Sequence, residues 1–159
     1  MSREALFAAL RQICGSDALA LDAAALEQAR HDVHESGGAP IAVLSPPDSA
    51  ALGGAVAAIT GHGVAVVPRG GGLSYTGGYV LPEGGAVLID LSRMNRVVAI
   101  DADSMTVTVE AGATWKAIDQ ALAQRGLRLP FFGTFSGAGA TVGGGLSHGA
   151  LFFGSARHG

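Results

Sequence analysis

The sequence contains a single cysteine, Cys14, among 159 residues. One cysteine cannot form a disulfide within the chain, and there is no cysteine cluster that could hold a metal ion. The formal net charge is only −3, which gives no electrostatic reason to expect a nucleic acid or an anionic membrane as partner. These absences argue against a disulfide-stabilised secreted domain, a cysteine-ligated metal protein and a nucleic-acid-binding protein.

The sequence also lacks a long uninterrupted hydrophobic run. Residues 1–14 alternate charged and apolar side chains, unlike the apolar core of a signal peptide. Residues 50–67 are apolar enough to mimic a membrane span, but Gly61-His62-Gly63 divides them into a helix and a strand. We therefore expect a soluble, cytoplasmic protein without a membrane partner.

Glycine, in contrast, is abundant. The chain holds 25 glycines, and five of them lie in the ten residues that follow Pro68, with the sequence Arg69-Gly70-Gly71-Gly72-Leu73-Ser74-Tyr75-Thr76-Gly77-Gly78. Glycine lets a ligand lie directly against the backbone, and successive N–H groups can form a concave nest for an anion. This stretch predicts a phosphate- or pyrophosphate-binding loop, with Arg69 adding positive charge. A long surface turn is the alternative interpretation.

The loop differs from two well-known phosphate-binding motifs. Tyr75 stands where the third glycine of G-x-G-x-x-G would be, and no Lys-Ser/Thr pair follows as in a Walker loop. The elements before it are predicted as helices over 2–14 and 23–35, a strand over 41–44, a helix from 46 to about 60 and a strand over 64–67. The strand–helix–strand order is a βαβ unit, so the loop should leave the carboxyl end of a parallel strand, where open α/β sheets bind ligands.

The second half of the chain predicts strands over 86–91, 96–100 and 105–110, the last two as a hairpin. Thr114 should cap a helix that Gly126 ends, with Trp115 as a core residue and less plausibly a flavin-stacking one. Residues 133–159 hold nine glycines and almost no regular pattern, which indicates a second backbone-lined ligand wall. His31, Asp32, His34 and Glu35 could be drawn as a metal cluster, but no other residue joins them. We expect a solvated helix end there and no metal site.

Two glycine loops separated by a hairpin and a helix carry a resemblance to a known family. The motifs are Pro68-Arg69-Gly70-Gly71-Gly72-Leu73-Ser74, Asp90-Leu91-Ser92-Arg93-Met94-Asn95-Arg96-Val97, Val109-Glu110-Ala111-Gly112-Ala113-Thr114-Trp115 and Ala140-Thr141-Val142-Gly143-Gly144-Gly145-Leu146-Ser147. Over about residues 40–159 they resemble the FAD-binding domain of the vanillyl-alcohol oxidase flavoproteins, also named after p-cresol methylhydroxylase (PCMH).

This resemblance implies an α+β fold of the PCMH type, in which a small βαβ subdomain is followed by a mixed or antiparallel β subdomain with helices. It implies an N-terminal helical segment over 1–38 and the N-terminal part of the FAD domain over 39–159. The fold would then be truncated, with the rest of the FAD domain and the substrate domain absent.

The resemblance also implies the cofactor and its binding residues. In the family, the first loop wraps the FAD pyrophosphate with backbone N–H groups, and the second runs along the flavin and the other side of the pyrophosphate. The cofactor-binding residues would be Pro68, Arg69, Gly70, Gly71, Gly72, Leu73, Ser74, Gly78, Thr141, Gly144, Ser147 and Leu151. The catalytic residues stay unknown. The run Gly154-Ser155-Ala156-Arg157-His158-Gly159 is similar to a Phe-Arg-His-Gly run of cytokinin-dehydrogenase-like members.

Three departures from the family pattern limit the chemistry. Many members carry a flavin-linked histidine where this chain has Leu73, and bicovalent members add a cysteine in the second loop, where none is found here. The flavin would therefore be held without a covalent bond through either loop. Ser136 stands where cytokinin dehydrogenases have an aspartate base, and a serine of ordinary pKa cannot take that proton unaided. Cytokinin oxidation is therefore disfavoured.

The sequence thus predicts the N-terminal fragment of an FAD-dependent oxidoreductase that acts on a small-molecule substrate. The whole protein would oxidise an alcohol, hydroxy acid or amine by hydride transfer to flavin, and the fragment alone would be inactive. The alternative is a non-catalytic remnant without stable FAD binding. A reductase of the cell-wall enolpyruvoyl-sugar type would be expected to have the motif Gly-x-Gly-Ser-Asn in the first loop, and Gly70–Ser74 does not match it.

Overall fold

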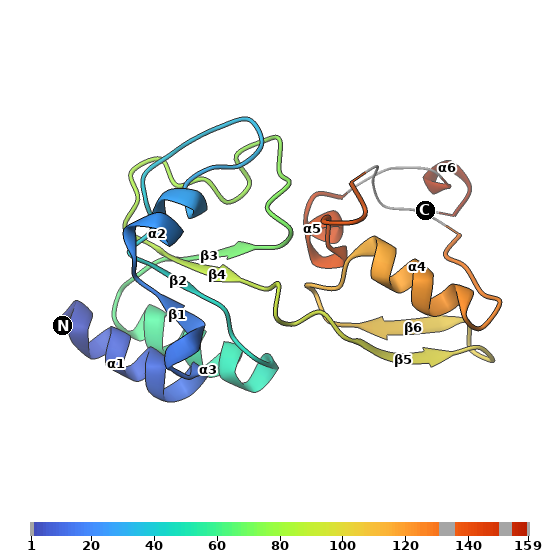
Figure 1. Cartoon of the computed structure of the whole chain (residues 1–159), viewed down its shortest axis with the longest axis horizontal. Helices are drawn as coiled ribbons and strands as arrows, with labels where there is room; N and C mark the ends of the chain where they lie inside the picture. Colours follow the sequence, from blue (N-terminus) through green and yellow to red (C-terminus); the bar gives the residue numbers. More distant parts are fainter. Residues whose placement is uncertain (1, 131–135, 150–153, 159) are drawn as a thin grey trace. The chain divides into compact units, whose positions relative to one another are not determined.

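A computed structural model of the chain describes residues 2–130, 136–149 and 154–158 (Figure 1). These residues belong to two compact units, Met1–Arg69 with Ser74–Arg93, and Gly70–Leu73 with Met94–Gly159. The first unit contains a four-stranded sheet with helices, and the second a two-stranded sheet with helices. The predicted α+β fold class is therefore confirmed.

The helices of the first unit begin within three residues of the predicted positions. Helix α1 (Arg3–Cys14) starts at Ser2, whose hydroxyl accepts a hydrogen bond from the N–H of Ala5 (3.4 Å). Helix α3 (Ser49–Gly61) starts at Asp48, whose carboxylate accepts one from Ala51 (2.8 Å). Both side chains satisfy N–H groups that a helix leaves without a partner in its first turn.

The two glycines inside α3 have different surroundings. A Cβ on Gly54 would lie 3.2 Å from Cγ2 of Ile13 in α1, whereas a Cβ on Gly53 would meet nothing within 4 Å. Close packing of α3 on α1 therefore accounts for a small residue at position 54. The structure offers no such reason at position 53.

The sheet of the first unit has the strand order β1-β2-β4-β3. Its strands are β1 (Leu19–Ala20), β2 (Ala42–Leu44), β3 (Val66–Arg69) and β4 (Val87–Asp90). Strands β2 and β3 run parallel to β4, which lies between them, and β1 is antiparallel to β2. The strand before the first glycine loop is therefore parallel, as predicted, although it lies two residues further along than expected. Its position at the sheet edge tolerates Pro68, which has no N–H to donate.

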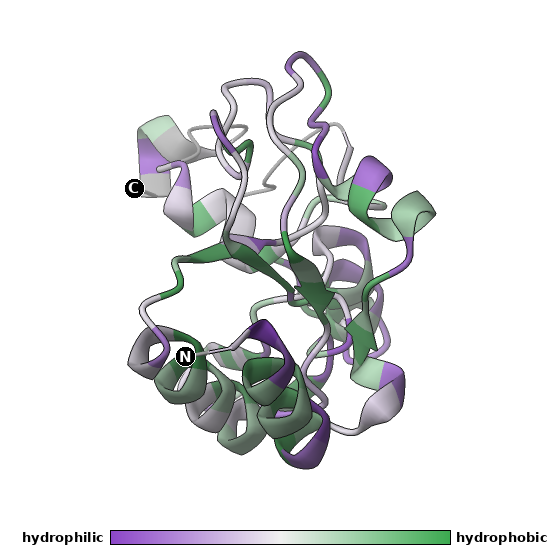
Figure 2. Ribbon diagram, turned by 90° about the vertical axis from the view of Figure 1, so that its left-hand side faces the viewer, coloured by the Kyte–Doolittle hydropathy of each residue, from purple (hydrophilic) through white to green (hydrophobic). Residues whose placement is uncertain are grey.

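Helices cover both faces of this sheet. Leu44, Val87 and Ile89 pack with α1 and α3 on one face, and Leu88 packs with α2 and Tyr79 on the other. Because side chains alternate along a strand, the apolar run of β4 serves both layers. Figure 2 shows these strands as a continuous hydrophobic centre between the helices.

Helix α2 is shorter than the sequence predicts. It spans Ala23–Ala29 and begins at Asp22, whereas the prediction extended it to Glu35. The Asp32 carboxylate accepts hydrogen bonds from the N–H groups of His34 (2.7 Å) and Glu35 (2.6 Å). This local turn competes with helix formation, so residues 30–35 form a loop and not a solvated helix end.

The second unit is built on the predicted hairpin. Strands β5 (Val97–Asp101) and β6 (Thr106–Val109) are antiparallel, and α4 (Trp115–Ala123) packs on them through Ile118 and Leu122. The hydroxyl of Thr114 caps α4 by accepting from Ala117 (3.2 Å). The hairpin and the helix after it are confirmed.

The glycine-rich tail is more regular than the sequence indicates. Helix α5 spans Val142–Ser147 and α6 spans Ser155–His158. Three consecutive glycines in α5 disfavour a helix by about 1 kcal/mol each, which is why the sequence shows almost no regular pattern there. Packing and the Thr141 cap, described below, outweigh that propensity.

Two further predictions stay predictions. The boundary between an N-terminal segment (1–38) and the FAD domain (39–159) is one. In the structure, elements on the two sides of this boundary contact each other in the first unit, because β1 pairs with β2 and α1 packs against α3. The cytoplasmic location is the other. Within the described ranges, no helix is both long and apolar enough to span a membrane.

Candidate functional site

Two glycine segments of the sequence meet in the second unit. A Cβ on Gly71 would collide with the carbonyl oxygen of Gly139, and one on Gly70 would collide with Oγ1 of Thr141. Cδ1 of Leu73 lies 3.2 Å from where a Cβ of Gly139 would be. The structure thus brings together the predicted residues Gly70, Gly71, Leu73, Thr141 and Gly144, with backbone against backbone.

The first of these segments leaves hydrogen-bond donors available. The N–H groups of Gly70, Gly71 and Leu73 donate to no residue that the structure describes. Gly71 and Leu73 are exposed, and Gly72 adopts a positive φ of 70°. A backbone without side chains in the way, turned by a left-handed glycine and carrying free donors, has the properties of an anion nest.

The N–H donors of the second segment are already bonded to acceptors of the protein. The N–H of Val142 bonds to the carbonyl of Ala113 (2.9 Å), that of Gly143 to Ala111 (2.9 Å), and that of Gly144 to Oγ1 of Thr141 (3.3 Å). Thr141 is buried, with 4% of its surface exposed. The first turn of α5 is therefore fixed by the protein itself and can serve as a wall more readily than as a set of donors.

Each glycine of α5 approaches a different neighbour. A Cβ on Gly143 would lie 2.8 Å from the Ala111 carbonyl, and one on Gly145 would lie 2.9 Å from Cζ2 of Trp115. Such separations are too short for real contacts, so only glycine fits without a shift. Trp115 is 5% exposed and packs beneath α5, which confirms its role as a core residue.

Arg69, in the first unit, holds the end of β3. Its Nη1 lies 3.3 Å from Oδ2 of Asp90, and its Cζ lies 5.4 Å from the centre of the Tyr79 ring. Both arginine and aspartate are largely buried, at 19% and 17% side-chain exposure. Burial raises the pKa of Tyr79, while the Arg69 charge acts to lower it. The Arg69 guanidinium thus already interacts with Asp90 and Tyr79. Its buried Nε has no hydrogen-bond partner among the described residues.

The hydroxyl of Ser74 organises the turn that follows it. Its Oγ accepts hydrogen bonds from the N–H groups of Thr76 (3.2 Å) and Gly78 (3.0 Å). The N–H of Gly77 bonds to Oδ2 of Asp32 (2.8 Å). Residues 74–78 thus form a braced turn in the first unit, and the sequence analysis missed the part that Asp32 plays in it. An aspartate two and three residues before bonded N–H groups is an Asx-turn pattern, and that signal could have found it.

The other predicted residues are placed as follows. Pro68 lies exposed in β3, and the hydroxyl of Ser147 donates to the carbonyl of Gly143 (2.9 Å) within α5. Leu151 lies outside the described residues. In the part of the chain that the structure describes, no three His, Cys, Asp or Glu side chains are grouped to hold a metal ion. The role of every site residue in cofactor binding stays a prediction.

Residues 40–159 match the FAD binding domain family. The chain belongs to this family. Its predicted membership of the PCMH-type FAD-binding domains is thereby confirmed, and its cofactor is FAD.

Two curated relatives illustrate the sequence similarity. The FAD-binding chain is 33% identical over 115 residues to the mitochondrial D-lactate dehydrogenase (cytochrome) of Arabidopsis thaliana, covering 72% of this chain and 20% of that protein. It is 33% identical over 91 residues to glycolate oxidase subunit GlcD of Bacillus subtilis, covering 57% of this chain and 19% of that protein. The chain thus spans about a fifth of each relative.

Solved structures show the same fold. Alkyldihydroxyacetonephosphate synthase matches with a TM-score of 0.82 at 22% identity, over 91% of this chain and 31% of that one. p-Cresol methylhydroxylase matches with a TM-score of 0.69 at 20% identity, over 78% and 25%. At these identities the likeness concerns the fold alone.

The residues of the second unit fit an FAD pyrophosphate. The close backbone approach at Gly70 and Gly71 excludes side chains, and the donors of Gly70, Gly71 and Leu73 are free of other partners among the described residues. No covalent link through Leu73 is chemically available, because an aliphatic side chain has no nucleophile. The described residues can therefore hold a dianionic diphosphate through backbone N–H groups.

Proposed function

We propose that this FAD-binding chain is the N-terminal part of an FAD-dependent oxidoreductase that holds its flavin without a covalent bond. The observation that carries the proposal is the packing of Gly70 and Gly71 against residues 139–141, which leaves bare backbone donors. Family membership supports an oxidoreductase parent.

The residues that would hold the cofactor have separate roles. Gly70, Gly71 and Leu73 would donate backbone N–H groups to the pyrophosphate. Residues 141–147 would form the wall along the cofactor, and their glycines would admit it without a steric clash. Bound FAD would supply hydride acceptance, while the protein positions it and excludes water.

The substrate class to test first is a hydroxy acid. The names of three relatives are D-lactate dehydrogenase, glycolate oxidase and D-2-hydroxyglutarate dehydrogenase, at 33%, 33% and 34% identity. An alcohol or an amine is the next class. Since the chain spans about a fifth of these relatives, we propose that it is inactive without the residues that contact substrate.

The deciding experiment is a titration of the purified chain with FAD, followed by flavin fluorescence and by the melting temperature. We expect saturable binding with a raised melting temperature. After denaturation, all of the flavin should be released as free FAD, and none should remain bound to the protein. Riboflavin, which lacks the pyrophosphate, is the matched control and should bind much more weakly. Absence of any FAD binding would overturn the proposal in favour of a remnant that does not hold FAD.

A further inference from the structure

The second half of the first glycine loop is fastened to a segment outside the family match. We call residues 31–36 the brace; the matched residues begin at 40. The N–H of Val33 donates to the carbonyl of Ser74 (3.1 Å), and the hydroxyl of Tyr79 donates to the carbonyl of His31 (2.6 Å). Figure 1 shows the two loops side by side above the sheet of the first unit.

Asp32 adds a further hydrogen bond between the brace and the loop. Its Oδ1 accepts from His34 (2.7 Å) and Glu35 (2.6 Å), and its Oδ2 accepts from Gly77 (2.8 Å). Only a carboxylate offers two accepting oxygens and no donor in so short a side chain. An asparagine could satisfy the turn or Gly77, but not both.

Gly77 is held in a conformation that needs support. Its φ is +66°, and a Cβ there would lie 2.7 Å from Oε2 of Glu35. Left-handed backbone of this kind is readily adopted only by glycine, which is also the residue with the most alternative conformations. The bond from Gly77 to Asp32 therefore selects one of many conformations that the loop could take.

The charge of Asp32 is stabilised by these donors. Burial raises the pKa of the carboxyl, but the backbone bonds from Glu35, His34 and Gly77, together with the Ser74 side chain, outweigh burial and lower it. Asp32 is thus ionised at neutral pH. An ionised carboxylate repels a phosphate, so its place beside a phosphate loop suits a positioning role and not a ligand role.

We propose that Asp32 is a positioning residue for FAD: by binding the N–H of Gly77 it holds Ser74–Gly78 in the conformation that the bound cofactor requires. A loop already ordered in the free protein does not lose that freedom on binding, so affinity rises. The inference rests on the proposed function, since it assigns a role in the same cofactor loop.

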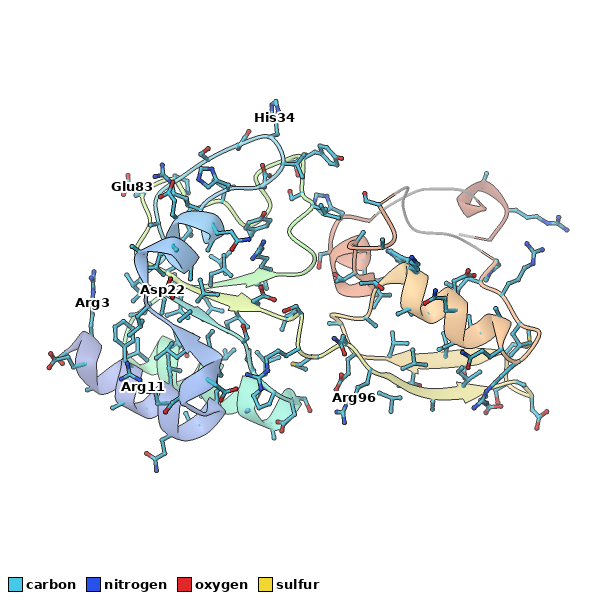
Figure 3. The ribbon with its side chains drawn as sticks, in the orientation of Figure 1. Arg3, Arg11, Asp22, His34, Glu83 and Arg96 are labelled. Carbon is cyan, nitrogen blue, oxygen red and sulfur yellow. The ribbon has the colours of Figure 1, made fainter. Side chains whose placement is uncertain are left out.

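The test compares Asp32→Asn with Asp22→Asn. Asp22 caps α2 with one oxygen, which accepts from Ala25 (2.9 Å), and Figure 3 shows it at the start of that helix. An asparagine caps a helix as well as an aspartate does, so Asp22→Asn controls for the loss of one carboxylate. The readouts are amide hydrogen exchange of residues 74–78 without FAD, and the dissociation constant for FAD.

We expect Asp32→Asn to speed exchange at residues 74–78 and to weaken FAD binding by roughly tenfold, the scale of one hydrogen bond to a charged group. Asp22→Asn should change neither. Asp32→Glu, which keeps two accepting oxygens, should recover part of the affinity. Asp32→Ser retains an oxygen for the turn at residues 34–35 but is too short for Gly77, and it provides the same comparison if Asp32→Asn does not fold.

The outcomes separate this inference from the proposed function. Wild-type binding of FAD with unchanged affinity in Asp32→Asn and Asp32→Ser would overturn the positioning role and leave the function standing. Failure of the wild type to bind FAD would overturn the function and, with it, the role in cofactor binding. In that case the exchange experiment still decides whether Asp32 holds the loop, and equal exchange in all chains would contradict this.

Discussion

The backbone of Gly71 lies so close to the carbonyl oxygen of Gly139 that no Cβ fits between them. The two residues belong to glycine-rich segments far apart in the sequence, and the structure packs them within the second unit. This contact places free N–H donors of one segment next to the wall formed by the other.

Replacement of Gly71 by alanine should abolish FAD binding. The methyl group would collide with the Gly139 carbonyl, and a backbone group cannot rotate away as a side chain can. Flavin fluorescence during FAD titration measures the effect. The control is Gly53→Ala, where a Cβ meets nothing within 4 Å; it should stabilise α3 by roughly 0.5–1 kcal/mol and leave binding intact. Full FAD affinity in Gly71→Ala would contradict the placement of the loop.

Replacement of Thr141 by valine should destabilise the protein by about 1 kcal/mol, the usual value of a helix cap. Valine has the same shape but leaves the N–H of Gly144 without the Oγ1 acceptor that it has in the wild type. Thr141→Ser keeps the acceptor and should behave much more like the wild type. Urea unfolding measures both variants. Equal stability of the serine and valine variants would show that the cap contributes nothing.

Replacement of Gly145 by alanine should displace the indole of Trp115. A Cβ at position 145 would lie 2.9 Å from Cζ2 of that ring, closer than carbon atoms approach in folded proteins. Trp115 is the one tryptophan of the sequence, so intrinsic fluorescence reports its surroundings alone. We expect a red-shifted emission maximum, which Gly53→Ala, with nothing within 4 Å of its Cβ, should not produce. An unchanged spectrum in Gly145→Ala would contradict the packing.

Acid should weaken the second unit through Glu110. Its carboxylate accepts from the side chain of Arg96 (2.6 and 3.0 Å) and from its backbone N–H (2.8 Å), and these bonds lower the pKa of Glu110. A lowered folded-state pKa means that the stabilisation is complete above the ordinary glutamate pKa of about 4.3 and is lost as the pH falls through the folded value.

The measurement is the free energy of unfolding as a function of pH for Glu110→Gln. The variant should be less stable than the wild type at neutral pH, and the difference should shrink in acid because the wild type then loses the same charge. Glu83, labelled in Figure 3, makes no ion pair with the described residues, and Glu83→Gln is the control. A difference between Glu110→Gln and wild type that persists unchanged into acid would refute the contribution of this charge.

Local patterns predicted much of the fold. Thr114 caps a helix where the sequence indicated, because a cap depends on residues only three positions apart. The hairpin of β5 and β6 was also predicted, from alternation and turn chemistry that are local as well. The error over residues 30–35 came from Asp32, whose turn is local but whose bond to Gly77 is not.

The sequence by itself determined the class of protein: its glycine loops and their order identified an FAD-binding domain, because a backbone that touches a diphosphate must lack side chains. It did not determine in which loop the N–H groups are left without a partner among the described residues. The tertiary structure decided that, since the N–H groups of Val142 and Gly143 bond to Ala113 and Ala111 while those of Gly70 and Gly71 donate to no described residue. It also decided that three glycines lie in a helix that Thr141 caps, and that the spaces beside Ala111 and Trp115 admit no Cβ at Gly143 and Gly145. Such contacts join residues distant in the chain, and no local pattern encodes them.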